Sequence, residues 1–395
     1  MSVYVELPGE IFSVIGENLS NGQFASALQA FDIGTAQSNE MCGLLHSIPL
    51  VENYISGPRI RIASEGAMSR FRLRKEEMKA TRGLWIFIDP SVELLPREFE
   101  GFHMDRISFI GTTMENGVVY GDKIVNGSRM FQGCTELTRI DCMTLNELTN
   151  GEDMFNGCST LSSLPDMMTL NELTDGGGMF CRCITLSALP ATMTLNALTN
   201  GEEMFRECSK LSSLPAAMTL NALTNGPYMF FGCWAISSLP AMTLDVLTNG
   251  EHMFYQCSKL TSLPAMTLNK LTNGDTMFNE CSKLSSLPAM TLNELTNGYC
   301  MFYQCHELYD LPALTLNELT DGRFMFFQCS GLSDLPAMTL NELTDGYCMF
   351  YQCSGLSSLP AATLKKLTNG ERMFSGCSVL SDLPAMTLRT VRSQD

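Results

Sequence analysis

One pattern of apolar and polar positions recurs along most of this chain. A unit that reads Met-Phe-x-x-Cys-Ser-x-Leu-Ser-Ser-Leu-Pro-Ala-Met-Thr-Leu-Asn-Glu-Leu-Thr-Asn-Gly-x-x returns every 24 residues, or every 25 where one residue is added after the Pro. A repeat of this length predicts a solenoid, because a single unit cannot bury its apolar face and stacking of the units supplies the core. The first Met of the unit stands at Met130, Met154, Met179, Met204, Met229, Met253, Met277, Met301, Met325, Met349 and Met373.

The spacing within a unit predicts its local structure. Met, Cys and Leu at i, i+4 and i+7, as in Met154, Cys158 and Leu161, predict a turn or two of helix that packs Met, Phe and Cys inward. The following Leu-Ser-Ser-Leu is the predicted strand, kept short because the next residue, Pro, has no N–H to donate to a sheet. The Asn-Gly or Asp-Gly pair predicts a turn in which Gly supplies a positive φ.

The repeat resembles a known family. Met-Phe-x-x-Cys-Ser-x-Leu-x-x-Leu, followed by Leu-Thr-Asn-Gly, is similar to the BspA-type leucine-rich repeats of bacterial surface lipoproteins and their protist relatives. The resemblance covers residues 127–388 and implies a leucine-rich-repeat-like solenoid, with a short parallel strand plus a short helix or turn in each coil of 24–25 residues. It departs at the Pro, where the family continues its strand, and in the lack of a recognisable export signal.

The remaining residues divide the chain into further parts. We expect a small α-helical module or cap at residues 1–50 and a transition with degenerate first repeats at 51–126, where residues 84–88 have strand composition. The regular solenoid of 11 repeats then spans 127–388, and a tail occupies 389–395. Terminal repeats are expected to be atypical, because the first coil must cover an open sheet edge.

The N-terminal segment carries a second resemblance. Ile11, Ile15 and Leu19 follow each other at i, i+4 and i+8, which predicts one apolar stripe of a helix. Together with Leu7 and Pro8 they resemble the opening of an F-box. That resemblance implies that Leu7, Pro8, Ile11, Ile15 and Leu19 bind the Skp-type adaptor of a cullin-RING ubiquitin ligase. The alternative is an amphipathic helix that only caps the solenoid.

Charge and hydropathy exclude several classes of function. The net charge of −17 argues against nucleic-acid binding, which needs Lys and Arg to neutralise phosphates, and against docking on an anionic membrane. No run of 18 apolar residues occurs, so no membrane insertion is expected. No secretory signal is recognisable at the N-terminus, and we therefore expect an intracellular protein, cytoplasmic or nuclear.

The cysteines indicate packing rather than chemistry. Eleven of the 16 stand four residues after the repeated Met, and one thiol per coil predicts reduced, buried side chains that act as small hydrophobes. Stacked thiols about 5 Å apart form a line, whereas zinc needs ligands that converge on one point. We expect no metal and no cofactor. The four histidines stand in unrelated contexts and are interpreted as surface variants, so the chain is not expected to be an enzyme.

Variation between repeats points to a binding surface. The core positions barely change, whereas the two residues before Met and the two after Phe do, and over the C-terminal half many of these are aromatic or Gln. Such side chains suit an interface with protein partners, although they could also merely stack on one another to shield the convex side. We call these side chains the aromatic stripe: Tyr228, Phe231, Tyr255, Gln256, Tyr299, Tyr303, Gln304, Phe324, Phe327, Gln328, Tyr347, Tyr351 and Gln352. The sequence thus predicts a non-enzymatic interaction scaffold, with a BspA-like structural or adhesive protein as the alternative.

Overall fold

A computed structural model describes most of the repeats and part of the chain before them. The described residues are 59–62, 64–73, 75–79, 84–88, 94–109, 124–141, 143–312, 314–335, 340–358 and 364–380. The chain forms two compact units, Met1–Leu170 with Cys183–Thr185, and Asn171–Arg182 with Leu186–Asp395. The predicted N-terminal module, with the F-box-like residues Leu7, Pro8, Ile11, Ile15 and Leu19, and the tail 389–395 lie outside the described residues.

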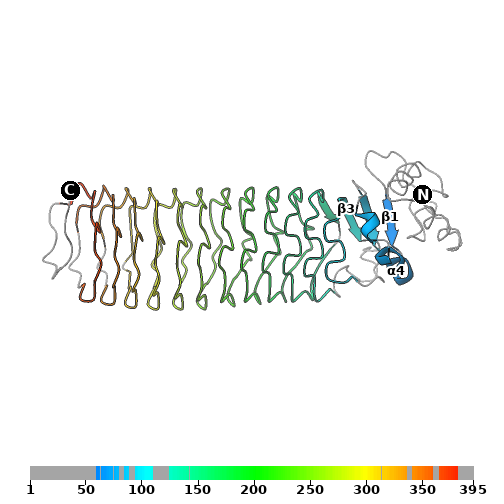
Figure 1. Ribbon diagram of the computed structural model, residues 1–395, viewed down its shortest axis with the longest axis horizontal. Coiled ribbons are helices and arrows are strands. Elements are labelled where there is room, and N and C mark those ends of the chain that lie inside the picture. The colour runs from blue at the N-terminus through cyan, green and yellow to red at the C-terminus, as the bar shows by residue number, and fades with distance from the viewer. Residues whose placement is uncertain are drawn as a thin grey trace. The chain divides into compact units, whose positions relative to one another are not determined.

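The first unit contains a parallel sheet in which neighbours along the chain are also neighbours in space (Figure 1). The strands are β1 (Arg59–Ile62), β2 (Leu84–Ile88), β3 (Met104–Phe109) and β4 (Arg139–Asp141), in the order β1-β2-β3-β4, and the helices are α4 (Glu65–Leu73) and α5 (Lys75–Met78). Ile86, Ile107 and Ile140 stand in register on successive strands and are buried, so one apolar row fixes the pairing. Phe71 of α4 packs on the rings of Phe99 and Phe102, at centroid distances of 5.7 and 5.6 Å.

The strand lies at the same position in the later repeats, but it is shorter there. β4 occupies the place of the Leu-Ser-Ser-Leu segment, which confirms a short parallel strand there. In the described later coils the same position holds at most a single parallel bridge, such as Ser262 to Ser286 and Ser286 to Asp310. Ile140 at the end of that segment in β4 is followed by Asp141, whereas Leu164 in the next coil is followed by Pro165, which cannot donate a hydrogen bond.

The prediction of a helix for the Met-Phe-x-x-Cys segment is wrong, because the segment is a series of overlapping turns. The N–H groups of Met130, Gln132 and Cys134 bond to carbonyls three residues earlier, at 3.0, 3.2 and 3.1 Å. The alternate N–H groups instead donate to carbonyls of the next coil, at 2.7–2.8 Å: those of Gly127, Arg129, Phe131 and Gly133. An α-helix would keep every such bond inside the segment. This segment therefore forms the main hydrogen-bonded ladder between coils.

Two residues in each coil adopt a left-handed backbone conformation, and neither is the Gly for which the sequence predicted it. The residue before Met and the residue before Cys have positive φ, as in His252 at 54° and Gln256 at 62°. The Gly of the Asn-Gly pair does not, so the prediction that it supplies the positive φ is wrong. A Cβ added at Gly274 would lie 3.1 Å from Leu295 Cδ1 and 3.2 Å from Met301 Sδ. A side chain at this position would therefore press on the Leu and Met of the next coil, which would have to shift by a few tenths of an ångström.

The repeated Phe residues form a continuous stack inside the second unit. Neighbouring rings from Phe180 to Phe374 lie 5.3–5.5 Å apart between centroids, and their planes differ by only 2–10°. Parallel planes at this centroid distance indicate offset stacking, which aromatic pairs prefer to direct overlap. In Figure 1 the successive turns of the second unit lie side by side, coil after coil, as this stack requires.

Each repeated Cys is a hydrogen-bond donor as well as a packing residue. The thiol of Cys281 donates to the carbonyl of Phe254 in the preceding coil at 3.2 Å, and the same contact recurs in all eleven coils at 3.0–3.3 Å. The described cysteines are all free thiols and buried. The prediction of reduced thiols that act only as small hydrophobes was therefore incomplete, because each thiol also donates to a carbonyl. That carbonyl can also accept a backbone N–H, as Phe254 O does from Cys257 N–H.

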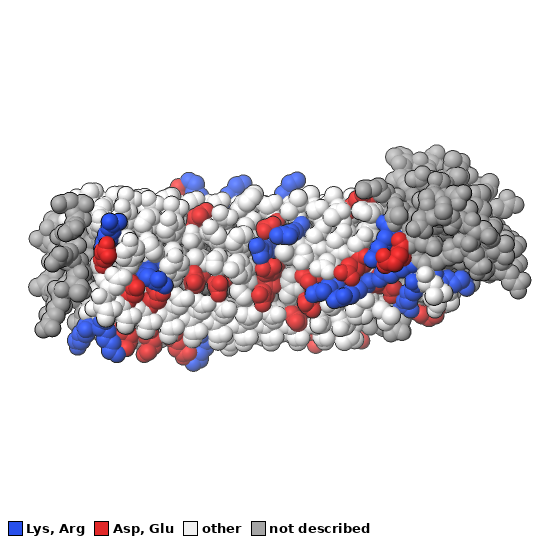
Figure 2. Space-filling model, viewed as in Figure 1, with Lys and Arg blue, Asp and Glu red and all other residues white. Residues whose placement is uncertain are grey.

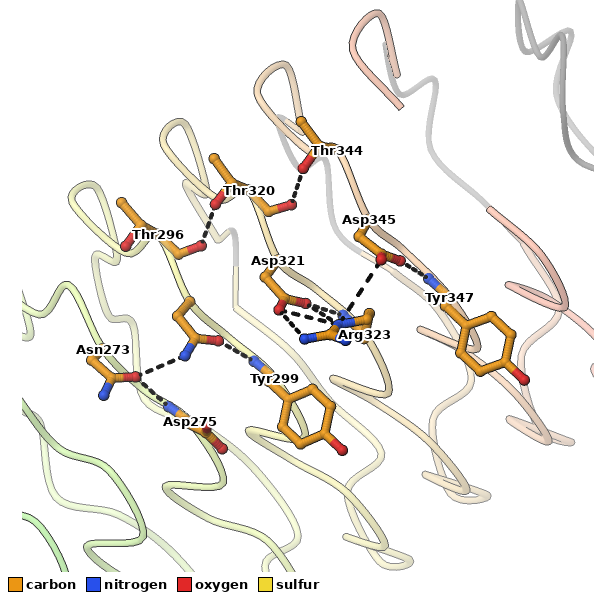
Figure 3. A network of polar contacts seen from close by, with 11 residues as sticks. Asn273, Asp275, Thr296, Tyr299, Thr320, Asp321, Arg323, Thr344, Asp345 and Tyr347 are labelled. Carbon is orange, nitrogen blue, oxygen red and sulfur yellow. Dashed lines mark hydrogen bonds and ion pairs between the residues drawn. The ribbon is translucent and has the colours of Figure 1, made fainter. Parts of the chain in front are cut away.

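Asparagine and aspartate side chains form a second ladder at the Asn-Gly turn. The oxygen of Asn297 accepts the N–H of Tyr299 at 3.1 Å, and its amide donates to Asn273 at 3.0 Å. Asp321 and Asp345 interrupt this ladder, because a carboxylate has no hydrogen to donate. Arg323 lies between them, at 2.7 Å from Asp321 and 4.0 Å from Asp345 (Figure 3). A cation thus replaces the missing amide hydrogens.

The buried thiols predict a loss of stability at alkaline pH. Burial raises the pKa of Cys257 and Cys329 to about 12 from the ordinary 9.0. The unfolded chain then releases thiol protons from about pH 9, whereas the folded chain keeps them to about pH 12, so the free energy of unfolding falls as pH rises through this window. In this window each such thiol lowers the free energy of unfolding by about 1.4 kcal/mol per pH unit, and below it the thiol has no effect on that free energy.

Urea unfolding followed at a series of pH values from neutral upward checks this expectation. Cys329→Ala should reduce the alkaline slope by the share of one thiol, while wild type should resist alkylation at neutral pH until it unfolds. Stability that stays flat well above pH 9 would contradict the assignment.

The Arg323 contact predicts a salt-dependent effect. Arg323→Ala leaves the Asp321 and Asp345 carboxylates facing each other, and we expect the free energy of unfolding to fall by about 1 kcal/mol or less, because these groups are partly exposed. High salt should remove most of the loss. Adding Asp321→Asn should restore stability, since Asn continues the amide ladder. A loss that neither salt nor the second substitution reverses would contradict the assignment.

Candidate binding surface

The aromatic stripe is built on the segment that joins the coils. The residue before Met and the residue after Phe are linked by a turn hydrogen bond, as in Phe327 N–H to Phe324 O at 3.0 Å. Their side chains therefore lie next to each other, and stacking brings the same pair of the next coil alongside. All residues of the stripe are half-buried except Gln352, which is exposed.

The structure divides the stripe into two clusters. The first, which we call the N-terminal cluster, consists of Tyr228, Phe231, His252 and Tyr255. The imidazole of His252 stacks on Tyr228 at 4.5 Å, and Phe231 meets Tyr255 edge to face at 5.0 Å. The guanidinium of Arg206 lies 5.2 Å from the centre of the Phe231 ring. His252 is thus not a simple surface variant, and its burial lowers its pKa.

The second, the C-terminal cluster, consists of six rings: Tyr299, Tyr303, Phe324, Phe327, Tyr347 and Tyr351. Phe327 stacks between Tyr303 and Tyr351, at 4.7 and 4.9 Å. Arg323 lies over the face of Tyr299, 5.0 Å from its centre. Figure 3 shows the Tyr299 and Tyr347 side chains extending in the same direction from coils on either side of Arg323. The cluster is therefore an ordered array whose ring faces contact one another.

Glutamines continue this order beside the C-terminal cluster. Gln304 donates to Gln328 at 2.8 Å, and Gln328 donates to Gln352 at 2.6 Å. A row of amides that hydrogen-bond to each other is fixed in place, and it still has lone pairs and N–H groups to offer to a partner.

One coil with small side chains separates the two clusters. Asn279 stands where the neighbouring coils carry Tyr255 and Tyr303. Thr276 and Asn279 are both buried, and the side-chain oxygen of Asn279 has no hydrogen-bond partner. Glu280 in the same coil accepts hydrogen bonds from Tyr255 and Gln256, at 3.2 and 3.1 Å. The stripe is thus not one continuous surface, and its middle is polar and acidic.

The arginines that contact rings of the stripe are paired with carboxylates. Figure 2 shows one face of the molecule, on which several Lys and Arg side chains lie next to Asp and Glu and most of the area is uncharged. Arg206 contacts Glu203 and Glu207, at 2.5 and 3.5 Å. Sequence reasoning missed Arg206, Arg323 and His252 as members of the surface. The signal for them was available, because they stand at the same variable positions as the aromatic residues.

The described residues offer no metal site and no reactive thiol on this surface. No group of three or more His, Cys, Asp or Glu in the described ranges is placed to hold a metal ion. Cys300 lies beside the C-terminal cluster, but burial raises its pKa to about 12, and that of Cys181 likewise, so both stay protonated at neutral pH. Within the same ranges, no helix is long and apolar enough to cross a membrane.

Residues 123–201 and 177–309 match a family model described as BspA type Leucine rich repeat region, in 6 copies. No curated protein matches the chain.

The chain is also similar to several solved structures, at low sequence identity and low TM-score. A TLR13 complex with ssRNA13 is 17% identical with a TM-score of 0.32, and the match covers 82% of this chain but 49% of that one, so this chain spans about half its length. A leucine-rich repeat protein from Eubacterium ventriosum is 12% identical with a TM-score of 0.33, covering 84% of this chain and 91% of that chain. The plant peptide hormone receptor RGFR1, in complex with RGF2, is 12% identical with a TM-score of 0.20, covering 82% and 66%.

The family match agrees with the coil geometry. The matched residues include the coils whose strand position, Phe stack and Cys hydrogen bonds are described above. The fold is therefore a leucine-rich-repeat solenoid, and residues 123–201 and 177–309 match repeats of the BspA type.

Proposed function

We propose that this protein is a non-enzymatic scaffold that binds protein partners through its aromatic stripe. The observation that carries the proposal is that the rings occupy positions where the fold does not require them. Coils elsewhere in the chain have the same backbone and coil-to-coil bonds with Arg129 before Met, or with Arg206 and Ser375 after Phe. Rings that folding does not need, held half-exposed in a fixed array, are typical of interface residues.

The order of the array favours binding. The rings of the C-terminal cluster are already held by stacking and edge contacts, so little side-chain freedom remains to be lost when a partner docks. The Tyr hydroxyls and the Gln row can supply hydrogen bonds at the rim of such an interface, while the ring edges supply apolar area.

The test replaces rings by residues that this chain itself carries at the same position. A triple variant with Tyr303→Asn, Phe327→Arg and Tyr351→Ser takes its residues from Asn279, Arg206 and Ser375. Immobilised wild type and variant are screened against a displayed peptide library, and selected peptides are ranked by affinity. We expect the variant to lose the ligands of wild type by at least tenfold in affinity, with a thermal midpoint that changes by only a few degrees.

A matched control changes a different face of the two coils that precede the altered rings. Ser262→Asp and Ser286→Asp follow Asp310, which holds the equivalent bridge position in the next coil, and should leave the selected ligands bound. If the ring variant binds the same peptides as wild type, the stripe is only a shield. The BspA-like structural or adhesive role would then be the better account.

The N-terminal sequence supports a finer proposal, a link to a cullin-RING ubiquitin ligase. In that role Leu7, Pro8, Ile11, Ile15 and Leu19 dock the Skp-type adaptor, and the solenoid presents a captured protein. The support is the match of these residues to the opening of an F-box. Purified Skp-type adaptor should bind the full chain, and Leu7→Ala with Ile11→Ala should abolish that binding. An adaptor that does not bind wild type would remove the ligase role and leave the scaffold proposal intact.

A further inference from the structure

The C-terminal cluster has a symmetric order of coils. Residues 298–305 and 346–353 both read Gly-Tyr-Cys-Met-Phe-Tyr-Gln-Cys, and the coil between them, 322–329, reads Gly-Arg-Phe-Met-Phe-Phe-Gln-Cys. The coil before the central one and the coil after it therefore carry identical side chains at these positions.

The contacts are symmetric as well. Phe324 meets Tyr299 and Tyr347 edge to face, at 5.9 and 5.2 Å and at interplanar angles of 83° and 78°. Phe327 stacks on a Tyr on either side, with planes within 3° and 8° of parallel. Gln328 hydrogen-bonds to a Gln on either side. The ring contacts are thus alike on both sides of the central coil, whereas the Gln row runs one way, with Gln304 donating to Gln328 and Gln328 to Gln352.

We propose that this face binds a second copy of the chain, antiparallel, around a two-fold axis that runs along residues 322–329. A two-fold dimer needs one patch that is complementary to itself, so that each contact occurs twice. Under this axis, residues 298–305 of one copy face residues 346–353 of the other, and ring edges and Gln amides meet their equivalents. The inference rests on the proposed function, because it names a partner for part of the aromatic stripe.

The flanking coils complement each other under the same axis. Residues 274–281, with the small side chains of Thr276 and Asn279, would face residues 370–377 of the second copy. Arg372 is exposed and would lie opposite Thr276, between the carboxylates of Asp275 and its own neighbour Glu371.

The centre of the interface avoids a charge conflict. Arg323 of each copy would face its equivalent at the axis, but each guanidinium is already paired with Asp321 through both of its oxygens. Five coils at about 4.8 Å spacing give a contact about 20 Å long. A contact this short belongs with the small, transient protein interfaces, so the dimer should dissociate at micromolar concentrations.

Sedimentation velocity of the full chain across the micromolar range tests the association. Wild type should shift from monomer to dimer, and Phe327→Arg, which places two further cations at the axis, should stay monomeric. Phe231→Arg makes the same change in the N-terminal cluster, outside the interface, and should dimerise like wild type. Tyr303→Asn gives a second, uncharged disruption. Thermal melts confirm that each variant is folded.

Cysteine cross-linking tests the direction of packing. Tyr303→Cys and Tyr351→Cys should form an intermolecular disulfide when the two variants are mixed and a mild oxidant is added, and neither should do so alone beyond the background of wild type. Phe327→Cys should cross-link to itself. Self-cross-linking of Tyr303→Cys would mean parallel packing and would overturn the proposal, as would a wild type that is monomeric at every concentration. Either result leaves the peptide-binding test of the scaffold unaffected, so the two proposals fail separately.

Discussion

Each coil divides the N–H groups of its Met-Phe segment between itself and the next coil, and the other features of the repeat depend on this division. The alternation requires left-handed backbone at two residues per coil, which tilts successive peptide groups in opposite directions. Because every coil must meet the next one in register, the Gly of the turn has to leave room for the following Leu and Met, as at Gly274. The Phe stack and the Cys-to-carbonyl bonds then recur at the same step.

The same constraint creates the variable surface. The residues before Met and before Cys carry positive φ, and a left-handed conformation costs a non-Gly residue on the order of 1 kcal/mol. The chain places Arg, Asp, His, Thr, Cys, Tyr, Phe, Glu and Gln there without any change in the ladder. What holds those residues is the set of backbone bonds to the adjacent coils and not their side chains. A fold fixed by its backbone ladder leaves those side chains free to be chosen for binding.

The sequence predicted the solenoid, its period and its inward-facing residues, because stacking demands that identical apolar positions recur at a fixed step. It also placed the short strand before Pro165, where the missing N–H limits pairing. It misassigned the Met154, Cys158 and Leu161 segment as helix, since two overlapping turns bring the same residues to one face as a helix does. The role of the turn Gly could not be read from sequence, because the atoms that exclude a Cβ belong to the next coil. For the surface, the ring positions were foreseen, whereas the separation at Asn279 and the pairing of Arg206 and Arg323 with rings depend on side-chain reach across coils.

The Asn-Gly turns have a consequence for the chemical lifetime of the protein. An Asn followed by Gly loses its amide most readily when the Gly nitrogen can swing onto the side-chain carbonyl and close a five-membered imide. In the stack, the nitrogen of Gly298 is held by its bond to the carbonyl of Asp321 at 2.8 Å, and the oxygen of Asn297 is engaged by Tyr299 N–H. The folded ladder thus opposes the ring closure that an unfolded coil would permit. Deamidation of these asparagines should therefore follow the opening of the coils. Each amide lost would add a carboxylate to the row of side chains in which Asp321 and Asp345 already need Arg323 between them.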